Sequence, residues 1–216
     1  MDPFEVIFRT GKKYHCPEGQ VLSRPDEEPM GVFYIYSGYV KAYDIDTTGE
    51  YQSIGIWGPG DIFPLYWALD ENGPRLFYEA ISPLEFSVLA RSKFKRQTEN
   101  NMPLLKATLA AVLKSFRYSQ ERIQNLELRT AKERIAFRLL FLAQHFGHKS
   151  KNVVEIAVPV TYQDMAESLS LTRETVNRTM RQLLTEGVVK RTNHHLTIQN
   201  IDYLRDIVGS ETTLDI

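Results

Sequence analysis

The chain has 216 residues, of which 43% are hydrophobic and 25% charged; this excludes collagen, a wholly disordered chain and a disulfide-dense miniprotein. A net charge of −1 excludes a basic field over the whole molecule, and a single cysteine, Cys16, excludes an intrachain disulfide and a four-cysteine iron–sulfur or zinc site. Because the sequence has neither a secretory leader nor a run of 18 apolar residues, we expect a cytoplasmic protein with no membrane partner.

The first 92 residues are predicted to form strands. Short segments rich in β-branched and aromatic residues recur there, at 32–36, 39–43, 51–56, 76–81 and 84–89. Turn sequences such as Gly58-Pro59-Gly60-Asp61 separate them. Regularly spaced short strands of this kind indicate an antiparallel barrel, sandwich or roll.

A helical period begins near residue 93 and continues to about residue 128. Apolar side chains alternate there at spacings of four and three, with Ser119 as the one polar member: Leu105, Leu109, Val112, Phe116, Ile123 and Leu126. So narrow a stripe is typical of the a and d positions of a coiled coil, and it predicts a homodimer with a parallel seam. The alternative is that this helix packs on its own β-domain.

The charge is concentrated beyond the long helix. Residues 129–201 hold 11 Lys/Arg against 6 Asp/Glu, a net charge of +5, whereas residues 1–128 and 202–216 each carry −3. A basic segment inside an acidic chain indicates an anionic partner such as a nucleic acid. This segment is predicted to begin with a helix over 132–146 and a strand over 153–160.

Residues 161–184 have the pattern of a helix-turn-helix. A capping box from Thr161 to Asp164 predicts the start of a first helix, and small Ala166 allows close approach of a second. A brief turn at 170–172 leads into that second helix, which ends near Gly187. Residues 188–198 are predicted to form a hairpin that serves as a basic wing.

The exposed face of the second helix has the chemistry of a DNA reader. Arg173 and Arg178 can each offer a planar fork to guanine, and Glu174 can accept from cytosine N4. The residues expected to contact phosphate or to belong to the wing are Thr161, Gln163, Thr175, Asn177, Arg181, Lys190, Arg191 and His194. The alternative is an ordinary solvated helix with an internal Arg–Glu pair.

The segment Thr172-Arg173-Glu174-Thr175-Val176-Asn177-Arg178 closely resembles the recognition helix of the cyclic-AMP receptor protein/FNR (CRP/FNR) family of bacterial transcription regulators. The resemblance covers nearly the whole chain. It implies an α+β fold with a cyclic-nucleotide-binding-like β-roll over 1–92, a dimerisation helix over 93–128 and a winged helix-turn-helix over 129–216. It also implies double-stranded DNA with half-sites similar to TGTGA and RNA polymerase as partners. Ser170 departs from the glycine usual at the turn.

The resemblance is weaker in the sensor half. Family members that bind cyclic AMP carry Gly-Glu and Arg-Ser in a short loop, where this chain has Gly60-Asp61 and an Arg75 that Leu76 follows. The aromatic loop residues Phe63 and Tyr66 belong either to the core or to a pocket for an apolar or aromatic effector. The candidate effector pocket comprises Gly60, Asp61, Phe63, Tyr66, Arg75, Ser119 and Gln120.

No cofactor, metal site or catalytic residue is predicted. A cupin-like β-roll enzyme would need a cluster of histidines and carboxylates inside the barrel, but this region contains only His15. Cys16-Pro17 is a weak candidate for a heme or redox site. A further alternative is a cyclic-nucleotide-type module that controls a partner protein, and the helix-turn-helix argues against it.

Overall fold

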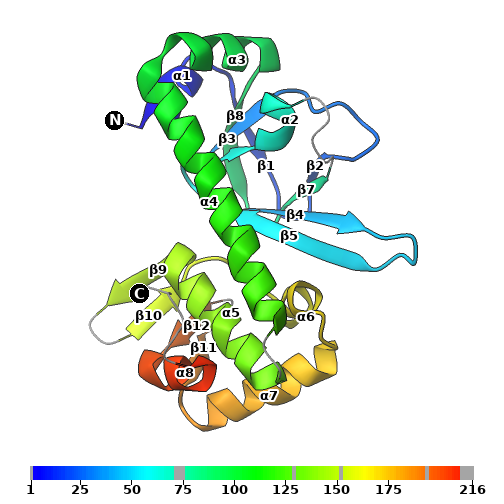
Figure 1. The fold of residues 1–216 in the computed structure, drawn as a ribbon, viewed down its shortest axis with the longest axis vertical. Helices are drawn as coiled ribbons and strands as arrows, with labels where there is room; N and C mark the ends of the chain where they lie inside the picture. Colours follow the sequence, from blue (N-terminus) through cyan, green and yellow to red (C-terminus); the bar gives the residue numbers. More distant parts are fainter. Residues whose placement is uncertain (1, 71–75, 128–129, 151–152, 193–194, 210–216) are drawn as a thin grey trace. The chain divides into compact units, whose positions relative to one another are not determined.

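The computed structural model describes residues 2–70, 76–127, 130–150, 153–192 and 195–209 (Figure 1). The chain divides into two compact units between Ser119 and Gln120, inside the long helix α4 (Met102–Glu127). The three-part division at residues 92 and 128 stays a prediction. No helix within the described ranges is both long and apolar enough to cross a membrane.

The first unit is built on two four-stranded antiparallel sheets. One has the strand order β1-β8-β3-β6 and the other the order β2-β7-β4-β5. The strands are β1 (Lys13–Cys16), β2 (Val21–Ser23), β3 (Val32–Ser37), β4 (Val40–Ile45), β5 (Tyr51–Trp57), β6 (Ile62–Phe63), β7 (Phe77–Ala80) and β8 (Leu84–Leu89). The predicted antiparallel fold is confirmed, and so is the α+β class.

Stacked aromatic rings join the two sheets at the centre of this unit. Phe63 on β6 stacks on Phe33 at 4.8 Å between centroids and on Tyr78 of β7 at 4.9 Å. All three side chains are buried. Each buried aromatic contributes about 1.5–3 kcal/mol from area alone, so these rings are a main source of cohesion between the sheets.

The prediction of strands throughout residues 1–92 was wrong at two short helices. Helix α1 (Pro3–Phe8) is capped by Asp2, whose carboxylate accepts from the Phe4 N–H at 3.0 Å. Helix α2 (Leu65–Leu69) buries Trp67. Neither helix is long enough to repeat the helical period, so the sequence pattern carries little signal for them.

The single helix predicted from residue 93 is two helices, α3 (Arg91–Asn100) and α4. Asn101 between them has an extended backbone, and its side-chain oxygen accepts from the Leu104 N–H at 3.2 Å. Pro103 then sits in the first turn of α4, where its missing N–H costs nothing.

The second unit surrounds helix α5 (Ala131–Phe146) with a small antiparallel sheet and three further helices. The sheet order is β11-β12-β10-β9. Its strands are β9 (Gly147–Ser150), β10 (Val153–Ile156), β11 (Val189–Thr192) and β12 (His195–Ile198), and the helices are α6 (Tyr162–Leu169), α7 (Arg173–Thr185) and α8 (Ile201–Val208).

The predicted strand over 153–160 starts at the right residue but is four residues too long, because β10 (Val153–Ile156) ends at Ile156. Sequence reasoning also missed β9, whose Gly-His-Lys-Ser sequence has no apolar alternation and which pairs only with β10 in this sheet. The predicted helix over 132–146 and the hairpin over 188–198 are confirmed to within a few residues.

Candidate DNA-binding site

The first helix of the motif, α6, starts as its sequence predicts. The Asp164 N–H donates to Thr161 Oγ1 at 3.1 Å, and the Thr161 N–H donates to Asp164 Oδ2 at 3.0 Å. This reciprocal capping box fixes the direction in which α6 leaves the preceding chain. Met165, Ala166 and Leu169 are buried on its inner face.

The turn between the two helices is tight because Ser170 adopts the left-handed conformation, with φ 52° and ψ 47°. Ser170 is the one non-glycine residue with positive φ in the described part of the chain. The Leu171 N–H then donates to the Ala166 carbonyl at 3.0 Å, which closes the end of α6. A side chain in this conformation is strained, which explains why glycine is favoured at such turns.

Replacing Ser170 by glycine should therefore stabilise the protein. A non-glycine residue in the left-handed region costs about 1–2 kcal/mol, and the greater entropy of unfolded glycine offsets part of it, so we expect a net gain of about 0.5–1 kcal/mol. Denaturant unfolding of Ser170→Gly would measure this gain, with Ser170→Ala as the control that keeps a β-carbon. A glycine variant less stable than wild type would contradict the assignment of strain.

The second helix, α7, is sharply two-faced. The side chain of its N-cap, Thr172, accepts from the Thr175 N–H at 3.2 Å. Val176, Met180 and Leu183 are fully buried on one face. The opposite face exposes the three residues expected to read bases, Arg173, Glu174 and Arg178. Of the residues expected to contact phosphate, Arg181 is exposed on this helix and Asn177 is half-buried.

The cations of the α7 face and of the wing form no ion pair within the described part of the chain. Among the residues that the structure describes, Arg173, Arg178, Arg181, Lys190 and Arg191 make no ion pair, whereas Lys13 and Lys132 each contact a glutamate. The alternative interpretation required an internal Arg–Glu pair on this helix, and these arginines form none among the described residues. Their charge is available to an external anion.

The wing hairpin lies in the same unit as α6 and α7. Its strand β11 exposes Lys190 and Arg191, and the Arg191 guanidinium lies 4.7 Å from the centre of the Tyr162 ring on α6. His194 lies outside the described residues, so its predicted role at the tip is not tested. The hairpin therefore supplies two exposed cations, of which Arg191 lies close to the start of α6.

Three of the residues expected to contact phosphate already make local hydrogen bonds. Thr161 takes part in the capping box, Thr175 Oγ1 lies 2.9 Å from Thr172 Oγ1, and Gln163 Nε2 donates to Glu167 at 2.9 Å. An amide nitrogen has two hydrogens and a hydroxyl has further bonding capacity, so Gln163 and the two threonines keep capacity for a further contact.

A network that sequence reasoning missed anchors the carboxyl end of α7. Tyr203 of α8 donates its hydroxyl to Glu186 at 2.9 Å and accepts from Lys132 of α5 at 3.2 Å. Hydrogen bonds from Gln182 and Tyr203 hold the pKa of Glu186 below its usual range. Only the fold brings these residues together, so no local sequence pattern could have revealed them.

The apolar stripe on α4 is largely exposed. Leu109, Phe116 and Ile123 are 57–59% exposed, and Leu105 is 43% exposed. The side chain of Leu126 lies outside the described residues. The face of α4 that packs on the β-domain is a neighbouring one, with Leu104 buried and Ala107, Ala111 and Val112 partly buried. Val112 is thus the one described member of the stripe that packs on this core.

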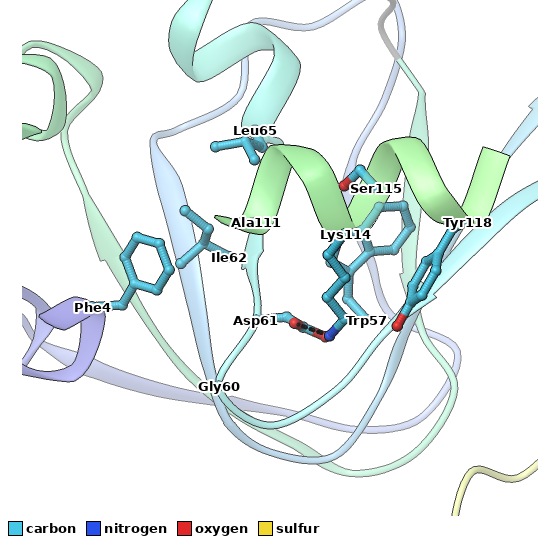
Figure 2. A pocket seen from close by; sticks show the side chains of 10 residues that line it. All are labelled: Phe4, Trp57, Gly60, Asp61, Ile62, Leu65, Ala111, Lys114, Ser115 and Tyr118. Carbon is cyan, nitrogen blue, oxygen red and sulfur yellow. Dashed lines mark hydrogen bonds and ion pairs between the residues drawn. The ribbon is translucent and has the colours of Figure 1, made fainter. Parts of the chain in front are cut away.

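A small pocket of about 40 Å³ lies between α4 and the segment that leads into β6. Figure 2 shows the side chains that line it. The residues that line it are Phe4, Trp57, Gly60, Asp61, Ile62, Leu65, Ala111, Lys114, Ser115 and Tyr118. Lys114 reaches down from α4 and pairs with Asp61 Oδ1 at 2.7 Å. Asp61 Oδ2 also accepts from the Gly58 N–H at 2.9 Å.

Of the six predicted effector residues that the structure describes, it brings Gly60 and Asp61 to this pocket. Phe63 belongs to the aromatic core instead, and Tyr66 is 44% exposed. Ser119 donates to the Ser115 carbonyl at 3.2 Å, and both Ser119 and Gln120 are exposed. Arg75 lies outside the described residues. Sequence reasoning missed Lys114, Trp57 and Tyr118, which no family motif marks.

The side chains considered for metal or heme lie on the first strand. His15 is exposed on β1 rather than enclosed by the barrel. The neighbouring Cys16 is half-buried, and burial raises the pKa of its thiol, which disfavours the reactive thiolate. Within the described ranges, His, Cys, Asp and Glu form no group of three or more that could hold a metal ion.

A β-domain joined through a long helix to a winged helix-turn-helix that exposes several arginines defines a class: transcription regulators with a helix-turn-helix DNA-binding domain. Residues 13–101 match the cyclic nucleotide-binding domain, and residues 133–207 match the Crp-like helix-turn-helix domain. The chain belongs to the CRP/FNR family of bacterial transcription regulators.

Named relatives agree with this assignment. The chain is 26% identical to the anaerobic regulatory protein of Aggregatibacter actinomycetemcomitans over 92% of its own length and 77% of the relative's. It is 25% identical to the fumarate and nitrate reduction regulatory protein of Escherichia coli K12, over 92% and 79%.

Solved structures support the same fold. FixK2 from Bradyrhizobium japonicum superposes with a TM-score of 0.80 at 24% identity, over 94% of this chain and all of that one. A CRP-family transcriptional regulator from Thermus thermophilus superposes with a TM-score of 0.75 at 19% identity, over 94% of this chain and 98% of that one. The winged helix-turn-helix architecture that the recognition sequence predicted is confirmed.

Proposed function

We propose that the protein is a cytoplasmic, homodimeric regulator that binds a palindromic DNA site with sequence specificity. The observation that carries the proposal is the exposed face of α7, where Arg173, Glu174 and Arg178 stand without ion pairs among the described residues. The family's character as transcription regulators supports it.

In this proposal α7 enters the major groove. Arg173 and Arg178 each donate to guanine O6 and N7, and Glu174 accepts from cytosine N4. The remaining predicted contacts fall on phosphates and hold the helix in register: Thr161, Gln163, Thr175, Asn177, Arg181, Lys190, Arg191 and His194.

The dimer would form through the exposed stripe on α4. Pairing the stripes of two copies in parallel covers Leu105, Leu109, Phe116 and Ile123, which water otherwise contacts. Two α7 helices then enter successive major grooves about 34–36 Å apart, and the site inherits the twofold symmetry of the protein. Family membership supports RNA polymerase as a further partner.

A mobility-shift assay with fragments of the source genome tests this function, with metal analysis of the same preparation. We expect a few fragments to shift at nanomolar protein while most do not, with no stoichiometric metal. Uniform retardation of all fragments would contradict sequence specificity. Stoichiometric metal with no shift would favour the cupin-like enzyme instead.

Cyclic AMP should not be the effector. Asp61, at the position expected to meet the ribose, already accepts from Lys114 and the Gly58 N–H. In the sequence, Arg75 is followed by Leu76, which has no hydroxyl, and preceded by Pro74, which has no N–H. The pocket of about 40 Å³ is also far smaller than the roughly 300–1,000 Å³ of ordinary ligand sites.

Two lost hydrogen bonds to charged groups cost roughly 3–6 kcal/mol, which turns a micromolar site into one of about millimolar or weaker. Titration calorimetry with cyclic AMP and cyclic GMP measures this directly. Micromolar binding of either nucleotide, with a parallel rise in DNA affinity, would overturn the expectation. An effector that binds in this pocket must displace the Lys114–Asp61 pair or enlarge the pocket beside it.

A further inference from the structure

Tyr162 and Arg191 contact each other although they are far apart in the sequence. Tyr162 is the first residue of α6, and Arg191 lies on strand β11 of the wing. The Arg191 Cζ atom lies 4.7 Å from the centre of the Tyr162 ring, within the range of a cation–π interaction. The contact joins the wing to the first helix of the DNA-binding motif.

The contact with the ring leaves the positive charge of Arg191 available to an external anion. The Arg191 side chain is exposed, and among the described residues it contacts no carboxylate. A ring accepts no conventional hydrogen bond at the carbon centre of a guanidinium, so the N–H donors of such an arginine remain able to bind an anion. Two other cations that lie over rings differ: Lys13 over Tyr36 also pairs with Glu85, and Lys132 over Tyr203 also contacts Glu186.

We infer that Tyr162 is a positioning residue for DNA binding: its ring holds the Arg191 guanidinium in the orientation that binds a backbone phosphate. The inference rests on the proposed function, because it assumes that the wing meets DNA. A free arginine side chain loses rotamer freedom when it binds, and one already held against a ring loses less. Tyr162 therefore raises affinity through Arg191 without a DNA contact of its own.

The inference predicts a uniform loss of affinity rather than a change of sequence preference, since phosphate contacts carry no sequence information. Tyr162→Leu, which keeps an apolar side chain but removes the ring, should weaken binding to matched and mismatched sites alike by about two- to fivefold. Tyr162→Phe keeps the ring and should stay within about twofold of wild type.

A double-mutant cycle separates positioning from a merely structural role. Arg191→Ala should weaken binding and lower the slope of log affinity against log salt by about 1 for each protomer of the proposed dimer. In that background Tyr162→Leu should cost nothing further, because the arginine that the ring positions is gone. Arg9→Ala, which removes an exposed arginine from the other unit, should leave affinity and salt slope unchanged.

Equal losses from Tyr162→Leu with and without Arg191 would overturn the inference, as would no loss where Arg191 is present. Should Tyr162→Leu unfold, Tyr162→Gln supplies a second variant without a ring. The wild-type protein and Arg173→Ala tell the two proposals apart. If wild type lacks specific binding, the proposed function fails; if Arg173→Ala alone changes the preference and Tyr162→Leu binds like wild type, only this inference fails.

Discussion

We expect Leu109→Asp combined with Phe116→Asp to convert the proposed dimer to a monomer that no longer binds specific DNA. Both side chains are more than half exposed in the single chain, so neither replacement removes core packing. In the paired state each aspartate would lie in an apolar seam without a partner, which costs several kcal/mol, about 2–7 for an uncompensated polar group and more for a charge. The free-energy cost of burying four such carboxylates in a dimer exceeds the stabilisation that a short apolar seam contributes.

Sedimentation velocity measures the oligomeric state, and a mobility shift on the same samples measures binding. The matched control is Ala110→Asp with Gln124→Asp, which places two new carboxylates at exposed positions of α4 outside the stripe. The control should remain dimeric. A double seam variant that still sediments as a dimer would mean that another surface joins the protomers.

Arg173→Ala should weaken specific binding by roughly 1–3 kcal/mol per protomer and relax the preference at one G·C pair in each half-site. The guanidinium is exposed at the start of α7 and has no ion pair among the described residues, so its removal leaves the fold intact. The loss comes from a bidentate contact to a single base, and therefore should depend on sequence.

Competition binding with sites substituted at each position measures that preference. Arg9→Ala is the control for loss of one positive charge. An Arg173→Ala protein with the wild-type preference at every position would show that α7 reads bases with other residues, or that another element reads them.

The recognition segment was predictable because its signals are local. A capping threonine at 172, apolar residues at 176, 180 and 183, and charges between them specify a two-faced helix, and the structure buries and exposes those positions as the period requires. The stripe on α4 was predictable for the same reason. The face that packs on the roll was not separated from it, because Leu104 and Ala107 are equally apolar and lie beside it.

The sensor pocket could not be predicted from residues close in sequence. Lys114 reaches Asp61 from a different element, and neither belongs to a motif that implies the other. Phe63 was ambiguous because a loop aromatic can line a pocket or fill a core. Phe63 lies in the core because it packs against Phe33 and Tyr78, and only the folded chain brings these rings together. Tyr162 and Arg191 are a similar case, since a strand and a helix supply one residue each.

Selection of binding sites from a random duplex library tests the central claim most directly. We predict enrichment of an inverted repeat whose half-sites resemble TGTGA, with the centres of the half-sites about 10–11 base pairs apart. The spacing follows from two α7 helices related by the twofold axis of the dimer. Enrichment of a single unrepeated element, or of no sequence at all, would contradict a symmetric dimer that reads DNA through α7.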